Sequence, residues 1–277
     1  MEEQPSHSSQ AGDELGEKDV NKLLLQYLLL HRGTCEEAQL LKALSTLDGS
    51  GRNEQERQAR LKKWITSVNL ALNALDYKVV RARNRFGGWS YVYVDLEPAN
   101  DTKGATTLSP DDLKFVQWAI QKFLDQKDTM QVEGAKSTVE NAVDRILSEK
   151  FGKSSFDGLQ LRVYHTCGST ELLQYTDLDA MAAEHLLVRL CQLRWFYETN
   201  EGRLGLDVRA LAELQTYLRE RYDVPTCVVC KELALEGVRC QCGASACHVA
   251  CLGHFLTHVG TECVSCGSSL ERAVYMV

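Results

Sequence analysis

The stretch Cys240–Cys251, which reads CQCGASACHVAC, places four cysteines and one histidine within twelve residues. Two further pairs flank it: CVVC, with Cys227 and Cys230, lies upstream, and CVSC, with Cys263 and Cys266, lies downstream. These three stretches offer nine candidate ligands, whereas two tetrahedral metal sites need eight. The sequence therefore predicts two metal ions and one surplus group.

Cys247 is the best candidate for the surplus group. It adjoins His248, and neighbouring side chains of an extended chain point in opposite directions, so we do not expect both to reach the same ion. We interpret Cys247 as a small buried apolar group beside the site. One alternative stays open, a substitute pair of Cys251 and His254, because His254 and His258 are spare imidazoles nearby.

The spacing of the remaining ligands favours an interleaved pairing over two successive modules. Only five residues separate Cys242 from His248, which leaves little room to finish one module and begin another. Four protein ligands on each ion leave no position for water or substrate, so both ions would be structural. Thiolates with imidazole suit zinc, and metal binding would supply the folding energy of so small a module. The expected sets are Cys227, Cys230, His248 and Cys251 for one zinc ion, and Cys240, Cys242, Cys263 and Cys266 for the other.

The composition is that of an ordinary soluble protein with two or three domains. The chain has 277 residues, of which 44% are hydrophobic and 25% are charged. Eight of the eleven cysteines lie in residues 227–277, and close CxxC pairs without an export signal favour zinc over disulfides in a cytosolic or nuclear protein. The longest apolar run, LLLQYLLL, is too short to cross a membrane, so no membrane association is expected.

Charge also narrows the choice of partners. A formal net charge of −7 argues against a generally basic nucleic-acid binder, so any contact with DNA would have to be local. The acidic and polar residues 1–18 are predicted to form a disordered tail.

Residues 19–100 have the pattern of three helices followed by a hairpin. Asp19 is expected to cap the first helix, and Thr34 and Glu37 have the spacing of a capping box that opens the second. The sequence then alternates around Gly87 and Gly88, which indicates a hairpin. Three helices and a two-stranded wing are the outline of a winged-helix domain. The apolar stripe of the third helix comprises Leu61, Trp64, Ile65, Val68, Leu72 and Leu75.

Residues 107–224 repeat this outline, and residues 225–277 form the zinc module. Ser109 is expected to cap one helix, and Ser137 with Glu140 to open the next as a capping box. We interpret residues 150–176 as an insertion, followed by a helix over about 177–194 with Met181 inward, a hairpin and one further helix. The predicted fold is mainly α with small β-hairpins: tandem winged-helix domains and a C-terminal cross-brace zinc module.

This organisation resembles a known family. The ligand order of four cysteines, one histidine and three cysteines follows LxLxxRALAELQxYLRERY and leads through CGASACHVAC. In these features the chain is similar, over about residues 19–270, to the variant-RING subunit of the SMC five–six complex, called non-SMC element one. The resemblance implies a chromosome-associated nuclear complex with a kleisin subunit and a MAGE-type winged-helix subunit, acting in DNA repair and recombination. It also implies RING-type ubiquitin transferase (E3) activity without a covalent intermediate, stimulated by the MAGE partner.

A RING-type ligase works by positioning a ubiquitin-charged conjugating enzyme. By analogy with RING modules, the docking groove would draw on apolar residues of the zinc module, and an equally good interpretation is that these residues pack between the two metal knuckles. Two departures from active RINGs, CVSC without a proline and Gly267 in place of a basic residue, fit a ligase that depends on its partner. The candidate docking residues are Val228, Val229, Leu252, Phe255, Leu256 and Val264.

The predicted wing offers a candidate DNA contact. Arg81, Arg83 and Arg85 alternate, which would place them on one face of a strand, and Lys62 and Lys63 on the preceding helix could complete a basic patch. We favour the simpler interpretation, a solvated edge strand protected by charge, because nothing marks a base-reading helix.

Three functional hypotheses follow. The chain is a ligase subunit that docks a conjugating enzyme, an architectural subunit that only mediates protein contacts, or a sequence-specific winged-helix regulator whose DNA binding depends on the wing arginines.

Overall fold

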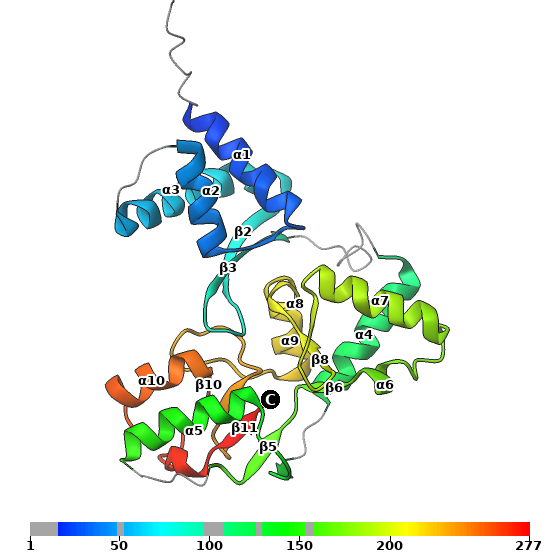
Figure 1. Cartoon of the computed structure of the whole chain (residues 1–277), viewed down its shortest axis with the longest axis vertical. Helices are drawn as coiled ribbons and strands as arrows, with labels where there is room; N and C mark the ends of the chain where they lie inside the picture. Colours follow the sequence, from blue (N-terminus) through cyan, green and yellow to red (C-terminus); the bar gives the residue numbers. More distant parts are fainter. Residues whose placement is uncertain (1–15, 49–52, 97–107, 126–128, 153–157) are drawn as a thin grey trace, which may run out of the picture.

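The computed structural model describes residues 16–48, 53–96, 108–125, 129–152 and 158–277. Within them the chain forms three units, each with its own apolar core (Figure 1). Residues 1–15 of the predicted disordered tail lie outside the described residues. None of the helices within these ranges combines the length and the apolar character that crossing a bilayer would require.

The first unit is a winged-helix arrangement. Leu24, Leu28, Leu40, Leu61 and Trp64 form the centre of its core. A three-stranded antiparallel sheet in the order β1-β3-β2 covers one side of its helices. Its elements are α1 (Glu17–Leu30), β1 (Thr34–Glu36), α2 (Glu37–Asp48), α3 (Glu54–Leu72), the 3-10 turn η1 (Asn73–Leu75), β2 (Tyr77–Arg83) and β3 (Trp89–Asp95).

Local signals misplaced three details of this unit. Helix α1 begins at Glu17, so Asp19 lies in its first turn, where a carboxylate favours the helix dipole, and is not its cap. Thr34 does not cap α2, because it belongs to β1 and pairs with β3. Leu75 lies in η1 beyond α3 and is exposed. Strand pairing overrides the local pattern at Thr34, and helix boundaries that differ from the predicted ones account for Asp19 and Leu75.

The second unit is also a winged-helix arrangement. The predicted cap at Ser109 is confirmed, with the Asp112 amide donating to the Ser109 hydroxyl. Met181 was expected to point inward, but it is exposed. The single helix expected after the hairpin is divided at Leu214. The elements are α4 (Pro110–Leu124), β6 (Thr166–Gly168), α6 (Ser169–Leu172), α7 (Ala180–Gln192), β7 (Phe196–Glu198), β8 (Arg203–Leu206), α8 (Val208–Glu213) and α9 (Gln215–Tyr222).

The third unit contains the cysteine-rich segment and a five-stranded sheet in the order β10-β9-β11-β5-β4. Strand β11 pairs antiparallel with β9 and parallel with β5, which joins the end of the chain to a much earlier segment. The elements are β4 (Met130–Gln131), α5 (Thr138–Phe151), β5 (Leu161–Val163), β9 (Gly237–Arg239), β10 (Ala246–Cys247), α10 (Val249–His258), the 3-10 turn η2 (Leu270–Arg272) and β11 (Val274–Met276).

The position of α5 differs from the expectation. Its capping box at Ser137 and Glu140 is confirmed, but α5 does not pack in the second winged-helix core. Its buried Val143 and Leu147 belong instead to the core of the third unit, beneath α10 (Figure 1). The Tyr275 hydroxyl donates to Asp144 on α5, which ties the helix to β11. The elements β4, α5 and β5 therefore form part of the third unit, although elements of the second unit flank them in the sequence.

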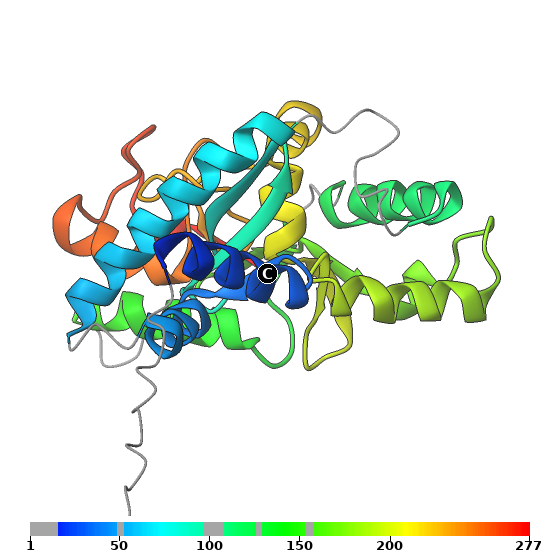
Figure 2. The ribbon, with the colours of Figure 1, turned by 90° about the horizontal axis from the view of Figure 1, so that it is seen from above.

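The three units meet at the tip of the β2–β3 hairpin. Figure 1 and the perpendicular view in Figure 2 both place α4 and α7 on one side of the molecule and α10 with α5 on the other. The hairpin of the first unit reaches the third unit, where a Cβ atom on Gly87 would lie 2.6 Å from the Cβ of Ala250 at the start of α10.

Candidate metal centre

The structure brings together the two sets of ligands that the interleaved pairing predicts. In each set all four ligand atoms lie within 4.8 Å of one another. Along the chain, the ligands come in turn from the segment before β9, the turn between β9 and β10, the start of α10 and the segment before η2. Each set therefore joins chain segments that a successive pairing would have kept apart. The first set is Cys227, Cys230, His248 and Cys251, and the second is Cys240, Cys242, Cys263 and Cys266.

The separations of the ligand atoms fit a tetrahedral zinc ion. Zinc–sulfur bonds of about 2.3 Å place the sulfurs of a tetrahedron about 3.8 Å apart. The sulfurs of Cys240 and Cys266 are 3.5 Å apart, and those of Cys242 and Cys263 are 3.7 Å apart. In the first set, 3.3 Å separates the Cys230 sulfur from Nδ1 of His248. Three thiolates with one imidazole, and four thiolates, are both donor sets that zinc favours.

The knuckles depend on left-handed backbone turns. The Lys231 amide donates to the Cys227 carbonyl at 2.9 Å, and the Gly267 amide donates to the Cys263 carbonyl at 2.9 Å. To close these turns, Lys231 adopts a φ of 66° and Gly267 a φ of 73°. Glycine adopts this conformation without steric cost. The geometry thus gives a local reason for glycine at a position where a basic residue would be expected in an active RING.

The tautomer of His248 is set by a contact outside the ligand set. Its Nε2 lies 2.8 Å from the Leu233 carbonyl oxygen. A carbonyl can only accept, so Nε2 carries the proton and Nδ1 faces the sulfurs with a free lone pair. This is the form of the imidazole that binds a metal ion.

The surplus groups lie where the sequence suggested. Cys247 is buried, and a hydrogen bond with Cys227 together with burial raises the pKa of its thiol, which therefore stays neutral. The substitute pair of Cys251 and His254 is not formed. His254 instead packs against His258 on the exposed side of α10, with 4.4 Å between the ring centres.

The candidate docking residues differ in accessibility. Leu252 and Phe255 are 0% and 3% exposed and belong to the core shared with α5, as does Leu256, so these three are not available to a partner in this structure. The structure supports the interpretation that these residues pack inside the module. They pack against α5, a helix that the sequence pattern assigned to the second winged-helix domain. Val228 and Val229 are half-buried. Val264, at 58% exposed, faces solvent.

Two of the three wing arginines share one face, as predicted: Arg81 and Arg83 both stack on the Trp89 ring, 3.9 Å and 4.1 Å from its centre, whereas Arg85 lies beyond the end of β2. Arg81 binds Glu37 through two contacts, Nε to Oε2 at 2.8 Å and Nη2 to Oε1 at 3.0 Å. Arg83 donates to the Gly87 carbonyl at 2.5 Å within the hairpin. Arg85 lies in the turn beyond β2 and pairs with Glu236 of the third unit at 3.2 Å. All three guanidinium groups therefore have contacts within the molecule.

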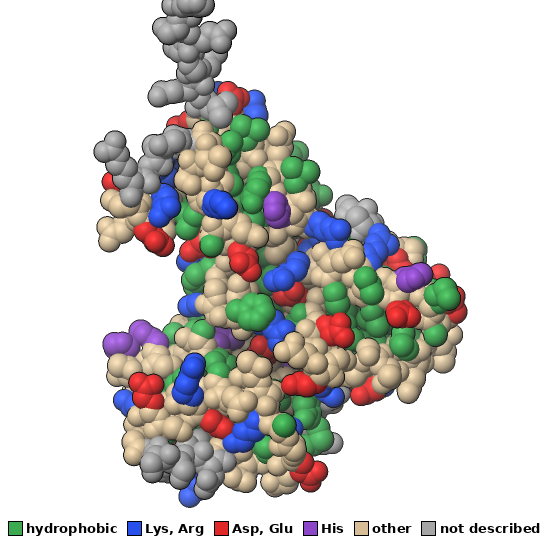
Figure 3. Space-filling view, in the orientation of Figure 1, with side chains coloured by type: hydrophobic (Ala, Val, Ile, Leu, Met, Phe, Trp, Pro, Cys, Tyr) green, Lys and Arg blue, Asp and Glu red, His purple; other side chains and the backbone are tan. Residues whose placement is uncertain are grey.

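The two lysines of the candidate basic patch lie on α3 and are exposed. Lys63 pairs with Glu17 at 2.8 Å, while Lys62 lies beside it in the sequence. On the face drawn in Figure 3, basic and acidic side chains are interspersed over all three units. The DNA contact stays a prediction. The alternative interpretation, a solvated edge strand, does not extend to Arg85, whose side chain is 22% exposed and pairs with Glu236 between the units.

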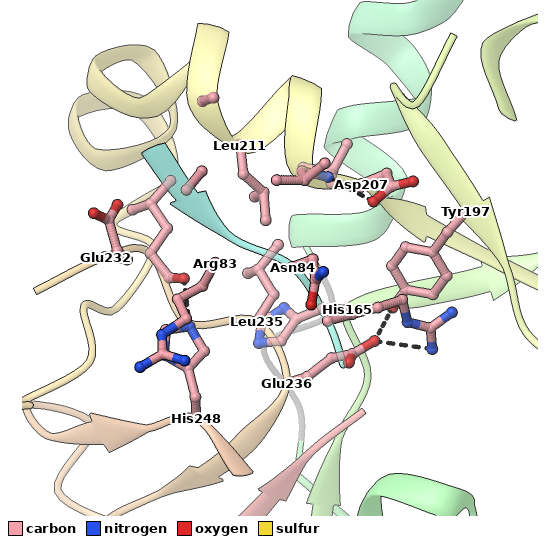
Figure 4. Close-up of a pocket in the computed structure, with 16 residues that line it drawn as sticks. Arg83, Asn84, His165, Tyr197, Asp207, Leu211, Glu232, Leu235, Glu236 and His248 are labelled. Atoms are coloured by element: carbon pink, nitrogen blue, oxygen red, sulfur yellow. Dashed lines mark hydrogen bonds and ion pairs between the residues drawn. The ribbon is translucent and has the colours of Figure 1, made fainter. Parts of the chain in front are cut away.

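Sequence reasoning missed a cavity of about 60 Å³, lined by both polar and apolar side chains, where the three units meet. Figure 4 shows side chains from each unit turned towards it. The cavity joins residues far apart in the chain, and no local pattern in the sequence indicates it. Its polar lining includes Arg83 and Arg85 from the wing, Tyr197 from the second unit, Glu236 and His248 from the third, and His165 from the link between β5 and β6.

Comparisons with known proteins agree with this architecture. A family model described as the Nse1 non-SMC component of the SMC5-6 complex matches residues 21–214. Non-structural maintenance of chromosomes element 1 of Saccharomyces cerevisiae is 34% identical over 92% of this chain and 95% of its own length. The Homo sapiens homolog is 24% identical over 90% of this chain and 82% of its own. A chain in a solved structure of an Nse1-Nse3-Nse4 complex has the same fold, with a TM-score of 0.66 and 18% identity over 93% of this chain and 98% of that chain.

Proposed function

Since the chain belongs to the Nse1 family of non-SMC components of the SMC5-6 complex, we propose that it is a RING-type ubiquitin ligase subunit of such a complex. Its third unit would hold two structural zinc ions and dock a ubiquitin-conjugating enzyme. The observation that carries this proposal is the pair of interleaved four-ligand sets, which is the arrangement of a cross-brace RING module.

The geometry supports a positioning role for this unit. Each set supplies four protein ligands, so a bound zinc ion would have no position for a substrate or a reactive water. The zinc ions would stabilise the fold, and the chemistry would take place between the charged conjugating enzyme and the acceptor amine. Catalysis would then come from holding the reactants in a productive orientation.

The partners follow from the family and from the solved complex that shares the fold. That complex is one of Nse1 with Nse3 and Nse4, which correspond to a MAGE-type and a kleisin partner. The two winged-helix units would bind these partners in a nuclear, chromosome-associated complex that acts in DNA repair and recombination.

One observation favours a second candidate, an architectural subunit without ligase activity. Helix α5 covers Leu252 and Phe255, so the apolar face of α10 is not accessible in this structure. A conjugating enzyme would have to use the remaining apolar residues, Val264 and the half-buried Val228 and Val229, unless a partner displaces α5.

Discharge of ubiquitin from a charged conjugating enzyme, with and without the MAGE-type partner, separates the two candidates. We expect the chain with its partner to accelerate discharge, and Val264→Asp to lower that acceleration about tenfold by placing a charge in an apolar contact that contributes about 1.4 kcal/mol. Val259→Asp is the matched control, because Val259 is equally exposed, at 58%, and lies at the end of α10. If the intact chain gives no acceleration in either condition, the architectural role is correct.

Metal content tests the zinc sites themselves. The purified chain should contain two zinc ions, and Cys247→Ala should retain both because Cys247 belongs to neither set. Cys242→Ala should lose the ion of the second set, since it removes one of four thiolates. Elemental analysis of the three proteins gives these counts. One ion in the intact chain, or a loss caused by Cys247→Ala, would contradict the assignment.

A further inference from the structure

The cavity between the three units contains a contact network with one residue from each. Nη2 of Arg85, at the tip of the wing, lies 3.2 Å from Oε1 of Glu236 in the third unit. The Tyr197 hydroxyl, from β7 of the second unit, donates to the same Glu236 oxygen at 2.5 Å. The Arg85 guanidinium also stacks on the Tyr197 ring, 3.7 Å from its centre. Figure 4 shows Tyr197 and Glu236 converging at one side of the cavity.

The network lies in a poorly solvated place. The Arg85 and Glu236 side chains are 22% and 14% exposed, so their attraction is screened less than that of a surface pair. Burial, and then the Glu236 carboxylate, raises the pKa of Tyr197 well above its usual value, so its hydroxyl remains a hydrogen-bond donor. The hydrogen bond from Tyr197 to Glu236 is therefore maintained across the physiological pH range.

Glu236 belongs to the segment that orients a metal ligand. Three residues before it, Leu233 provides the carbonyl that accepts the Nε2 proton of His248 at 2.8 Å. One residue after it, Gly237 approaches the backbone of β10 so closely that a Cβ atom there would lie 2.2 Å from the Cys247 carbonyl oxygen. The segment is thus held at its far end by backbone packing and at Glu236 by the network.

The network reaches only one of the two metal sets. Among the eight ligands, all of which lie in the described part of the chain, His248 alone lines the cavity. The second set is supported by separate contacts, such as the hydrogen bond of 2.8 Å between the Ser245 and Ser265 hydroxyls.

We propose that Arg85, Glu236 and Tyr197 form a latch through which the wing of the first unit positions His248 and retains the metal ion of the first set. The second set is independent of this latch. The three residues are positioning residues that act through Leu233 on the imidazole. The inference rests on the zinc sites proposed above, and it assigns to the wing a role inside the molecule.

The test measures metal release from each set of the full-length protein. The two sets are told apart by replacing zinc with cobalt, because the visible absorption of a site with three thiolates and one imidazole differs from that of a site with four thiolates. Loss of an outer contact to a metal-bound histidine weakens metal binding about tenfold or more. We therefore expect Arg85→Ala and Glu236→Gln each to accelerate release of the first ion to a chelator about tenfold and to leave the second unchanged.

Two controls separate the latch from general loosening. Arg81→Ala removes another wing arginine, whose partner Glu37 lies outside the cavity, and should leave both rates unchanged. Arg85→Lys retains the charge and should restore slow release in part. The double variant Arg85→Ala with Glu236→Gln should release the first ion no faster than either single variant, because both remove the same contact.

The outcomes distinguish the latch from the zinc sites. Two bound ions with wild-type release rates in Arg85→Ala and Glu236→Gln would overturn the latch and leave the zinc sites intact. Equal acceleration from both sets would also overturn it, because it would indicate loosening of the whole unit. An intact chain that binds no zinc would instead remove the proposed function.

Discussion

At the scale of single residues, Cys247 and His248 show how a one-residue step decides between packing and metal binding. Cys247 lies in β10 with its side chain in the core, and His248 follows as the first residue of the turn into α10, with Nδ1 towards the sulfurs. Successive side chains of an extended chain alternate in direction. That rule singled out Cys247 as the surplus thiol in the sequence, and the structure leaves Cys247 outside both ligand sets. The same rule predicts that a chain in which the two residues are exchanged would lack the fourth ligand of the first set.

His165 provides a prediction about the dependence of stability on pH. It lines the cavity and is 7% exposed. Burial, and then the charge of Arg239, lowers the pKa of its imidazole from 6.5 to about 4. Between these two values the unfolded chain binds a proton that the folded chain does not, so the free energy of unfolding falls as the pH falls. At pH 5 the loss amounts to about 2 kcal/mol relative to neutral pH.

Replacing the imidazole should remove this contribution. We expect the free energy of unfolding of His165→Leu, measured with urea, to rise relative to the wild type by about 2 kcal/mol when the pH is lowered from about 7.5 to about 5. Comparison at equal pH cancels the effect of metal loss, which the two proteins share. His185→Leu, on an exposed residue of α7, should show no such relative change. A relative stability of His165→Leu that does not vary with pH would contradict the assignment of a lowered pKa.

At the scale of elements, local signals located the long helices of the two winged-helix domains but not always their neighbours. The interpretation of residues 150–176 as an insertion was wrong, because β5, β6 and α6 lie there and belong to the sheets and core of the second and third units. The cap at Ser109, the capping box at Ser137 and the hairpin around Gly87 follow from side chains within a few residues, and the structure confirms them. The spacing of apolar residues along α5 showed that one face of this helix is buried, but the spacing does not identify the elements that cover this face. Its partners, α10 and β11, lie about a hundred residues later in the chain.

Contacts between side chains far apart in the chain could not be predicted from the sequence. Glu140 is buried on α5 and pairs with Arg162 at 2.7 Å, and only the packing of β5 beside the helix brings the two together. The cavity is a similar case, because its lining comes from three units. Ligand pairing was predictable for the opposite reason: zinc requires four ligands in fixed geometry, and the short gaps in the cysteine-rich segment allowed few ways to arrange them.

At the scale of the whole molecule, the third unit combines two distant parts of the chain around the metal sites. Its core includes Val143 and Leu147 of α5, Val163 of β5, and Phe255 of α10. The metal ligands Cys227 and Cys251 belong to the same core. Zinc bound to these ligands would therefore stabilise a core that extends to α5 and β5, and loss of the metal should affect both elements.

Hydrogen exchange after chelation tests this coupling. When both ions are removed from the full-length chain, we expect amides of α5 and β5 to lose protection together with those of α10, because their shared core loses the binding free energy of the metal. Amides of α4 and α7 should remain protected, since their core contains Phe115, Ile120 and Leu190 and no metal ligand. The division expected from the sequence, with residues 107–224 as one domain, makes the opposite prediction: α5 would keep its protection with α4 and α7 after chelation. Mass spectrometry of exchanged peptides from residues 138–151 decides between the two, and retained protection there would show that α5 is stable without the metal-binding unit.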